Sequence, residues 1–378
     1  MENEERIPIC IVAPKNGAYS ETFIKAHVDG LPADVKFLWG GWFPVFTDAD
    51  TPLLSRAAAA SALRKVSRKI LHLPPAFFAE RALKKFLVKN RVRAVLAEYG
   101  PTGVSVMNVC KRSRIPLIVH FHGVDAHSEK MLSHFQPGYR TLFAVAETLV
   151  VVSRTMESQL LRLGAPAEKI FYNPYGVDLD FFTATDPSRN LPLFAAVGRF
   201  VDKKAPFLTL LAFQKVAAEV PEARLVMIGD GELRETCLRL AKSLNIVGAV
   251  DIMGVRSAPE IAACLRGARA FVQHSVQTSY GDSEGTPVAV LEAGAMGLPV
   301  IATRHAGIRE AVVEDETGLL SAEGDIEGMA RNMIRLAKDP MLALRLGAKA
   351  RERIATHYSL EKSIANLWQA IRRTIPHA

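Results

Sequence analysis

A segment at 283–292, with the sequence SEGTPVAVLE, contains the residue types that let a helix N-terminus bind an anion. Thr286 is a favoured N-cap residue and Pro287 a favoured first residue of a helix, so we predict that a helix begins there. The free backbone N–H groups and the positive end of the dipole at such a terminus attract phosphate. Gly285 has no side chain and lets a ligand approach the backbone closely.

Two carboxylates bracket this segment. Glu284 stands just before the expected helix, and Glu292 stands almost two turns into it among apolar residues. A buried carboxylate needs hydrogen-bond donors, and sugar and ribose hydroxyls are such donors. Glutamates at this spacing also occur as ordinary surface residues, because glutamate favours helices. The residues that accompany them decide between the two interpretations.

Two cations follow another expected strand. Arg199 and Lys204 come after the apolar run at 193–197 and before Pro206, which is a favoured first helical residue. Exposed basic residues are common in loops. Their place between a buried strand and a helix N-terminus nevertheless favours anion binding.

Polar residues also end the expected strands of the first half. His122 stands at the carboxyl end of the strand expected at 116–121, directly before a glycine. Open α/β sheets bind their ligands at this edge, so a binding role is favoured over a purely structural one. Asp125 and Ser153 follow strand ends as well and are candidate pocket residues on that ground alone.

The elements that must position these residues alternate between short β-branched runs and longer helical patterns. This alternation is typical of βαβ units and of parallel sheets covered on both faces. A polar stretch at 183–192 has two prolines and no apolar periodicity, as expected for a linker. We predict an α/β fold with domains at 1–182 and 183–357 and a C-terminal helix at 358–378 that returns to the first domain. The expected strands are 7–13, 35–39, 94–98, 116–121 and 148–152, then 193–197, 224–228, 249–253, 268–273 and 299–302.

Length and composition agree with two soluble domains. The chain has 378 residues, of which 49% are hydrophobic and 23% charged, and these values exclude a disordered or fibrous protein. The four cysteines, Cys10, Cys110, Cys237 and Cys264, show no paired or metal-ligand spacing. We therefore expect reduced thiols in a cytoplasm, with no disulfide framework and no zinc site. No signal segment or membrane span is expected at the N-terminus.

The net charge of +8 is concentrated at 55–93, where eleven Lys or Arg residues stand against one acidic residue. Apolar residues recur there at helical spacing, with the basic residues on the other side, so we predict amphipathic basic helices. A solvated helical face is the simpler interpretation, and contact with an anionic membrane surface is the alternative. The basic residues expected to meet such a surface are Arg64, Lys65, Arg68, Lys69, Lys84 and Lys85.

The second half carries several motifs in an order that resembles a known family, the retaining GT-B glycosyltransferases that share an E-x7-E element, often called family four. Besides the two glutamates, the matches are VGRF at 197–200, IGDGE at 228–232, MG at 253–254 and GLPVIA at 297–302. Each motif is weak alone, and together they are specific. The fold implied is GT-B, with two Rossmann-like domains that face each other across a cleft.

The resemblance extends through the first half. HFHGVD at 120–125 is similar to the strand-end His-Gly element of the family, and NPYGVD at 173–178 is similar to its interdomain turn. GAYSETFI at 17–24 departs from the commoner Gly-Gly loop. It resembles a branch of colanic acid type that acts in bacterial exopolysaccharide and lipopolysaccharide assembly.

This resemblance implies how the residues would hold a nucleotide-sugar donor. Arg199 and Lys204 would bind the diphosphate and offset the charge of the departing nucleotide. Glu284 would accept hydrogen bonds from the donor sugar, Glu292 would hold the ribose, and His122 would touch the transferring sugar from the opposite domain. The other donor-binding residues implied are Gly17, Gly254, Val255, Gly285, Thr286, Pro287 and Val288, with Asp125, Ser153 and Asn173 as further pocket candidates.

The expected function is transfer of a hexose from a nucleotide diphosphate to a glycan or lipid-linked acceptor in bacterial cell-surface polysaccharide synthesis, with retention of anomeric configuration. A UDP-sugar is the first expectation and GDP-mannose the second, because nothing at 253–257, where the family places its base pocket, distinguishes the bases. The family commonly needs no metal, so we expect neither metal nor cofactor. We expect a cytoplasmic protein, peripheral at the inner face of the plasma membrane.

Two alternatives remain open from the sequence. A nucleotide-sugar epimerase or hydrolase on the same fold would need general-acid carboxylates, and none can be located. A nucleic-acid-binding protein is the more distant alternative. Single-strand binders interleave aromatic residues with the charge, whereas Phe77, Phe78 and Phe86 fall mainly on the apolar face of the basic segment.

Overall fold

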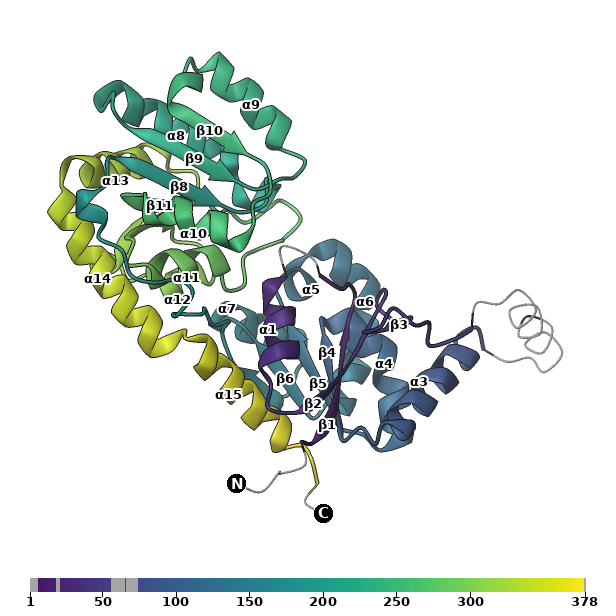
Figure 1. The fold of residues 1–378 in the computed structure, drawn as a ribbon. Helices are drawn as coiled ribbons and strands as arrows, with labels where there is room; N and C mark the ends of the chain where they lie inside the picture. The colour runs from purple at the N-terminus through teal and green to yellow at the C-terminus, as the bar shows by residue number, and fades with distance from the viewer. Residues whose placement is uncertain (1–5, 18–20, 56–64, 66–73, 377–378) are drawn as a thin grey trace, which may run out of the picture. The chain divides into compact units, whose positions relative to one another are not determined.

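The computed structural model describes residues 6–17, 21–55, 65 and 74–376 of the chain (Figure 1). The helix expected across 63–73 lies outside the described residues, apart from Lys65. The chain divides into two compact units, of which one comprises Met1–Val152, Met156–Asn173 and Ile364–Ala378 and the other comprises Ser153–Thr155 and Pro174–Ser363. Each unit is an α/β structure, so the predicted class of two Rossmann-like domains is confirmed.

The first unit is built on a seven-stranded sheet with the order β3-β2-β1-β4-β5-β6-β7. Neighbouring strands run parallel except β2 and β3, which are antiparallel. Strands β4 and β5 are buried along their whole length, because helices cover both faces of a parallel sheet. The strands are β1 (Pro8–Ala13), β2 (Asp34–Trp39), β3 (Phe46–Thr47), β4 (Ala94–Glu98), β5 (Leu117–Phe121), β6 (Thr148–Val151) and β7 (Ile170–Tyr172).

The helices of the first unit connect these strands as crossovers (Figure 1). Apolar residues at helical spacing bury one side of these helices, as Leu83 and Leu87 do in α3, which packs against α4. The helices are α1 (Thr22–Gly30), α3 (Phe77–Lys89), α4 (Gly100–Ser113), α5 (Val124–His127), α6 (Glu129–Val145), α7 (Arg154–Arg162) and the later part of α15 (Leu360–Arg372). Across the described part of the chain, no helix has both the length and the apolar character needed to span a membrane.

The second unit is built on a six-stranded parallel sheet with the order β10-β9-β8-β11-β12-β13. Its strands are β8 (Leu193–Val197), β9 (Arg224–Ile228), β10 (Val250–Met253), β11 (Ala270–Gln273), β12 (Val300–Thr303) and β13 (Gly318–Ser321). Its helices are α8 (Pro206–Glu219), α9 (Arg234–Ser243), α10 (Ala258–Arg266), α11 (Val288–Ala295), α12 (Ile308–Ala311), α13 (Ile326–Lys338) and α14 (Pro340–His357).

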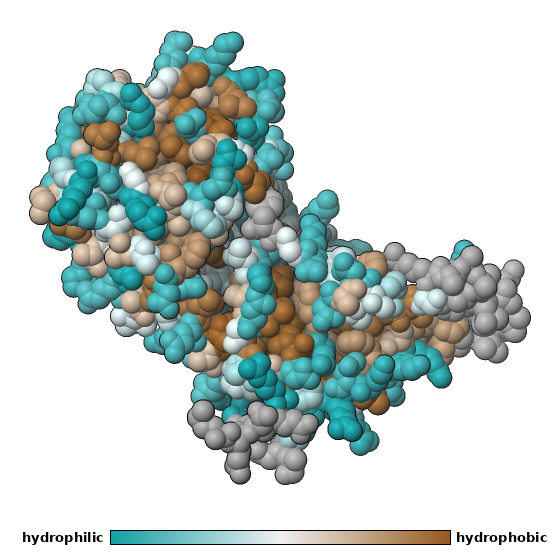
Figure 2. Space-filling view, viewed as in Figure 1, coloured by the Kyte–Doolittle hydropathy of each residue, from teal (hydrophilic) through white to brown (hydrophobic). Residues whose placement is uncertain are grey.

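Apolar side chains fill the second unit between its sheet and its helices. Phe194 and Val272 from the sheet pack with Phe213 of α8, Met333 of α13 and Leu346 of α14 in one buried cluster. Hydrophilic residues cover much of the surface outside such clusters, with apolar residues visible between them (Figure 2). The sheet is thereby held rigid, and the loops at the carboxyl ends of its strands are free to carry polar groups.

The long segment of the second unit begins at Pro174, before the linker that the sequence predicts at 183–192. Backbone pairing at Val177 places this segment in the second unit. The Val177 N–H donates to the Tyr358 carbonyl, and the Val177 carbonyl accepts the Leu360 N–H, both at 2.9 Å. These bonds tie the segment after Asn173 to the end of α14. Composition reveals polar, proline-containing stretches but not such long-range backbone pairing, so the predicted boundary falls later.

Candidate functional site

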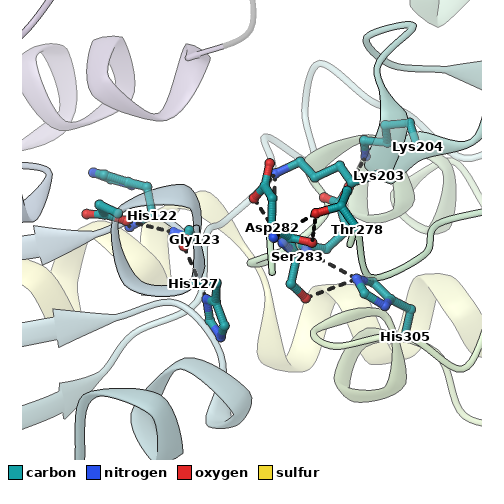
Figure 3. Close-up of polar contacts among 11 residues, drawn as sticks. His122, Gly123, His127, Lys203, Lys204, Thr278, Asp282, Ser283 and His305 are labelled. Atoms are coloured by element: carbon teal, nitrogen blue, oxygen red, sulfur yellow. Dashed lines mark hydrogen bonds and ion pairs between the residues drawn. The ribbon is translucent and has the colours of Figure 1, made fainter. Parts of the chain in front are cut away.

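The loop that follows β11 is fixed by side-chain contacts before it reaches Glu284. Lys203 is buried, and its Nζ donates to Asp282 Oδ1 and to the Ser283 carbonyl oxygen, both at 3.2 Å (Figure 3). Thr278 Oγ1 accepts the Asp282 N–H at 2.8 Å. The loop has no regular secondary structure, yet these contacts hold one backbone path into Glu284.

Glu284 is buried at the end of this loop and forms an ion pair with Lys204, whose Nζ lies 3.2 Å from Glu284 Oε1. Burial raises the pKa of Glu284, but the charges of Lys204 and Lys203 outweigh burial and hold that pKa at about 2. Burial lowers the pKa of Lys204, against the opposing effect of Glu284. The ion pair lacks hydrogen-bond geometry. Among the described residues, Oε1 therefore keeps its capacity to accept a ligand hydroxyl.

A histidine that the sequence did not single out lies behind the same loop. His305 Nε2 lies 3.0 Å from Ser283 Oγ and accepts the Glu284 N–H at 3.2 Å (Figure 3). Its Nδ1 lies 2.6 Å from Glu323 Oε1. His305 follows strand β12 at its carboxyl end, as His122 follows β5, and that position is the signal from which it could have been found.

Helix α11 begins one residue later than the sequence predicts. Pro287 is the N-cap residue, with an extended backbone at φ −79° and ψ 98°, so the assignment of Thr286 as N-cap was wrong. The Pro287 carbonyl accepts the first helical bonds, from the N–H groups of Val290 at 3.0 Å and Leu291 at 3.3 Å. The helix therefore starts at Val288, and its N-terminus follows the Glu284 loop as expected.

Glu292 is half-buried within α11. Burial raises its pKa to about 7. A carboxyl group in this environment exchanges its proton near neutral pH and gains from any donor that reaches it. Burial of Glu292 is the physical reason for its predicted need of hydroxyl donors, and whether such donors bind it stays a prediction.

Gly285 and Gly307 approach each other so closely that neither chain segment can shift inward. A Cβ atom placed on Gly307 would lie 1.8 Å from the Gly285 carbonyl oxygen. Gly285 and Thr286 are buried. The turn before α12 therefore supports the turn before α11, and the absence of a side chain at Gly307 is what allows this contact.

Arg199 and Lys204 border a small hollow of about 30 Å³ at the carboxyl end of β8. Arg199 is exposed, so its guanidinium is accessible to a soluble ligand. Gln273 lies in the same lining, and its buried Oε1 has no hydrogen-bond partner among the described residues. His274 is neutral there, because burial lowers its pKa to about 4.

The predicted base-binding residues follow β10. The Gly254 carbonyl accepts the Gly229 N–H at 3.3 Å, which joins the ends of β9 and β10. The side chain of Val255 is 42% exposed. An exposed apolar side chain at this edge of the sheet can cover the flat face of a nucleotide base.

In the first unit, His122 belongs to a buried network centred on Glu98. Glu98 Oε2 lies 2.8 Å from His122 Nε2, and Oε1 lies 2.8 Å from His27 Nδ1. Burial raises the pKa of Glu98, but the charge of His27 and the hydrogen bonds of both rings outweigh burial and hold that pKa well below its usual range. The carboxylate thus accepts from both rings. Phe23 and His120 each stack on His122 with ring centroids 4.5 Å apart.

Three of these residues, Glu98, His120 and His122, place potential metal-ligand atoms within 4.8 Å of one another. Their arrangement does not fit an ion. The two imidazole rings stack at 23°, so the planes that contain their nitrogen lone pairs are nearly parallel and do not meet at one point between the rings. Both oxygens of Glu98 already meet histidine nitrogens. We therefore interpret the cluster as a hydrogen-bonded network.

Asp125, a predicted pocket residue, is buried and bonds to backbone. Its Oδ1 accepts the N–H groups of His122 and Gly123, both at 3.0 Å, and its Oδ2 accepts the Gly100 N–H at 2.9 Å. Figure 3 shows His122 and Gly123 at this turn. Asp125 therefore fixes the loop that carries His122.

The other predicted pocket residues also lie at the carboxyl ends of strands. Gly17 is exposed after β1, and its φ of 70° is a conformation that favours glycine. Ser153 and Asn173 are buried, after β6 and β7 respectively. The Asn173 N–H donates to the Val151 carbonyl at 2.9 Å, which extends the pairing of these two strands.

Two family models match the chain. Residues 181–353 match the model described as glycosyl transferases group 1, and residues 31–176 match the glycosyl transferase 4-like domain. WcaL of Salmonella typhimurium, named provisionally as a colanic acid biosynthesis glycosyltransferase, is 29% identical over 286 residues, which are 73% of this chain and 70% of the relative. The amylovoran biosynthesis glycosyltransferase AmsK of Erwinia amylovora is 28% identical over 255 residues, 67% of this chain and 63% of the relative.

Solved structures share the fold at low sequence identity. Anabaena Alr3699/HepE in complex with UDP has a TM-score of 0.74 at 14% identity and covers 97% of this chain and 100% of its own. A glycosyltransferase from Rickettsia africae ESF-5 has a TM-score of 0.75 at 16% identity, covering 99% and 100%. The two mainly parallel sheets and the two family matches define a glycosyltransferase with the GT-B fold. Within that class the chain belongs to the group 1 and 4-like glycosyltransferases, the E-x7-E family that its motifs resemble.

Proposed function

We propose that this glycosyltransferase moves a hexose from a nucleotide diphosphate to a glycan or lipid-linked acceptor in bacterial cell-surface polysaccharide synthesis, with retention of configuration. The relatives named for colanic acid and amylovoran biosynthesis support the process, and the UDP complex of HepE supports the donor type. The single observation that carries the proposal is the buried Lys204–Glu284 pair at 3.2 Å before helix α11. It places a cation and a hydroxyl acceptor side by side.

Each of these groups has a role that follows from its chemistry. Arg199 and Lys204 offset the charge that develops on the diphosphate as the sugar departs, and this role needs no metal ion. Glu284, ionised at all physiological pH values because its pKa is about 2, accepts donor-sugar hydroxyls. Glu292 accepts the ribose hydroxyls. His122 contacts the transferring sugar.

A panel of donors tests the proposal. Purified protein is incubated with UDP-glucose, UDP-galactose and GDP-mannose, with and without a membrane extract as acceptor, and nucleotide release is measured. We expect one UDP-sugar to be used, with GDP-mannose as the second choice, and expect Glu284→Ala to lower release by on the order of a hundredfold. Release of free sugar or of an epimer with no acceptor dependence would favour an epimerase or hydrolase and contradict the transferase.

We also propose that the basic segment contacts an anionic membrane surface at the inner face of the plasma membrane. In α3, Lys84 and Lys85 are exposed while Leu83 and Leu87 are buried, so the helix presents its charge outward. A lipid-linked acceptor would be held at such a surface. Four further residues of the proposed contact precede α3, namely Arg64, Lys65, Arg68 and Lys69.

A further inference from the structure

His305 occupies a position that no motif assigns. It follows strand β12, whereas the glutamate whose backbone it contacts belongs to the loop after β11. Figure 3 shows its ring pointing at Ser283 and at the backbone beside it. The side chain is 3% exposed, so its polar contacts are made with protein.

The partners of His305 fix its protonation. Burial raises the pKa of Glu323, but hydrogen bonds from the Gln277 N–H and from His305 outweigh burial and hold that pKa below its ordinary value. Glu323 is therefore an ionised acceptor, and Nδ1 of His305 carries the proton between them. A backbone N–H can only donate a hydrogen bond. Nε2 lies 3.2 Å from the Glu284 nitrogen, so Nε2 is the unprotonated nitrogen of the ring. The ring is the neutral Nδ1–H tautomer.

We infer that His305 is a positioning residue for Glu284, and that Glu323 sets the tautomer that lets it act. One imidazole nitrogen accepts the Glu284 N–H and lies 3.0 Å from Ser283 Oγ, so it contacts two consecutive residues of the loop. Lys203 holds the same loop from the other side through Asp282. The inference rests on the proposed role of Glu284 toward the donor sugar.

The arrangement requires an acceptor at one position. A proton on Nε2 would face the Glu284 N–H, and two donors cannot bond each other. The side chain at position 305 must therefore offer an acceptor atom to the backbone of Glu284.

Two substitutions distinguish the hydrogen-bond acceptor of His305 from the volume of its side chain. His305→Gln can place an amide oxygen where Nε2 lies and accept the Glu284 N–H. His305→Leu keeps the volume and leaves that buried N–H without an acceptor. We expect kcat/KM for the nucleotide-sugar donor to fall about 10- to 100-fold in the Leu variant and to stay within about threefold of wild type in the Gln variant.

Rescue by glutamine supplies a readout that simple destabilisation would not give. If only the volume of His305 mattered, the Leu variant would be at least as active as the Gln variant. We expect the opposite order, because only glutamine offers an acceptor to the Glu284 N–H. His357→Gln, at an exposed histidine, is the matched control and should leave kcat/KM unchanged.

The protonation of His305 Nε2 can be measured directly. ¹⁵N NMR of labelled protein should show His305 Nε2 as an unprotonated nitrogen at pH 7.5, whatever the enzyme's substrate. A protonated Nε2, equal kcat/KM in wild type and His305→Leu, or equal loss in the Leu and Gln variants would each overturn the inference. Glu284→Ala, assayed beside them, keeps the failures apart, because full activity in that variant would instead overturn the proposed role of Glu284.

Discussion

Lys204 Nζ lies 3.2 Å from Glu284 Oε1, although the two residues belong to loops that follow different strands, β8 and β11. Parallel strands end at the same edge of a sheet, so residues 80 positions apart meet there. The pair keeps both charges in a buried setting. A donor diphosphate and a sugar hydroxyl need those two charges at neighbouring points.

Removal of either member of this pair should abolish most transfer. We expect Lys204→Ala and Glu284→Ala each to lower kcat by on the order of a hundredfold, about 3 kcal/mol of lost transition-state interaction. Donor turnover with the best nucleotide sugar is the measurement. Lys215→Ala, which breaks an exposed pair with Glu327, is the control and should turn over normally. Near-normal turnover in both test variants would show that the donor lies elsewhere.

Glu292 should make stability and nucleotide binding depend on pH. Its pKa of about 7 in the folded protein lies above the ordinary value of 4.5, so its stabilising contribution is complete below pH 4.5 and is lost as pH rises through 7. The loss is about 3 kcal/mol at most, and urea unfolding at pH 5 and pH 8 measures it. Glu292→Gln should remove this pH dependence. An unchanged dependence in the variant would assign it to another group.

The same carboxyl group should couple nucleotide binding to proton release. Ribose hydroxyls that donate to Glu292 favour its charged form, so binding lowers its pKa and expels a proton near pH 6.5. Calorimetry of UDP binding in buffers of different ionisation enthalpy measures the number of protons released. We expect release in wild type and none in Glu292→Gln. Equal proton release from both proteins would show that the ribose does not bind Glu292.

The strands were predictable because burial on both faces leaves unbroken β-branched runs, as in 94–98, which matches β4 residue for residue. β3, with two residues, and β7, with three, were not expected, because runs so short have no periodicity. β13, with the sequence GLLS, was missed for the same reason. The pairing of Val177 with Tyr358, both in the second unit, leaves no trace in local composition.

The positions of Glu284 and Lys204 after strand ends were predictable, because a charged residue type and a strand end coincide in the sequence. The role of a residue was not predictable where it depends on contacts with residues that are distant in the sequence. Glu98 ends a strand whose register places it beside His120, and only the fold shows that His27 completes the network. Lys203 and Lys204 are adjacent residues of the same type. Lys203 nevertheless donates to Asp282 and to the Ser283 carbonyl, whereas Lys204 pairs with Glu284.

Loss of Glu98 should destabilise the first unit. Glu98→Ala leaves the buried nitrogens of His27 and His122 without their acceptor, and we expect about 3 kcal/mol less unfolding free energy at pH 7. Because the pKa of Glu98 is held below its ordinary 4.5, its contribution is present above pH 4.5 and is lost as pH falls further, so the two proteins should converge in acid. Chemical unfolding at pH 7 and pH 3.5 tests both statements.

An exposed ion pair provides the comparison for Glu98. Lys25 and Asp29 pair on the surface of α1, so Asp29→Ala should change the unfolding free energy by less than about 0.5 kcal/mol. If Glu98→Ala proved no more costly than Asp29→Ala, the hydrogen bonds of Glu98 to the two histidines would contribute little to the stability of the first unit.

A methyl group at Gly307 should disturb the donor loop through sterics alone. Gly307 has an ordinary helical φ of −65°, so alanine is not strained by its own backbone. Its Cβ would nevertheless lie 1.8 Å from the Gly285 carbonyl and must displace it. We expect Gly307→Ala to raise the donor KM about tenfold or more and to lower stability by about 1–3 kcal/mol. Gly248→Ala, where a Cβ meets nothing within 4 Å, should change neither quantity.

The basic face of α3 should bind anionic lipid. Each Lys or Arg near such a surface contributes about 1 kcal/mol, and the attraction weakens with salt because the Debye length falls from about 10 Å at 0.1 M to about 3 Å at 1 M. Purified protein should cosediment with vesicles that contain phosphatidylserine, not with neutral vesicles, and should be released at 1 M salt.

Charge reversal tests whether this face is the contact. Lys84→Glu with Lys85→Glu should weaken cosedimentation, and the further change of Arg64, Lys65, Arg68 and Lys69 to Glu should abolish it, with use of soluble donor intact in both proteins. Lys242→Glu with Lys349→Glu alters the net charge equally at exposed positions of the second unit and is the matched control. A control that loses binding as strongly as the α3 variant would show that net charge, not this helix, draws the protein to the membrane. Undiminished binding after all six changes would eliminate the segment as the contact.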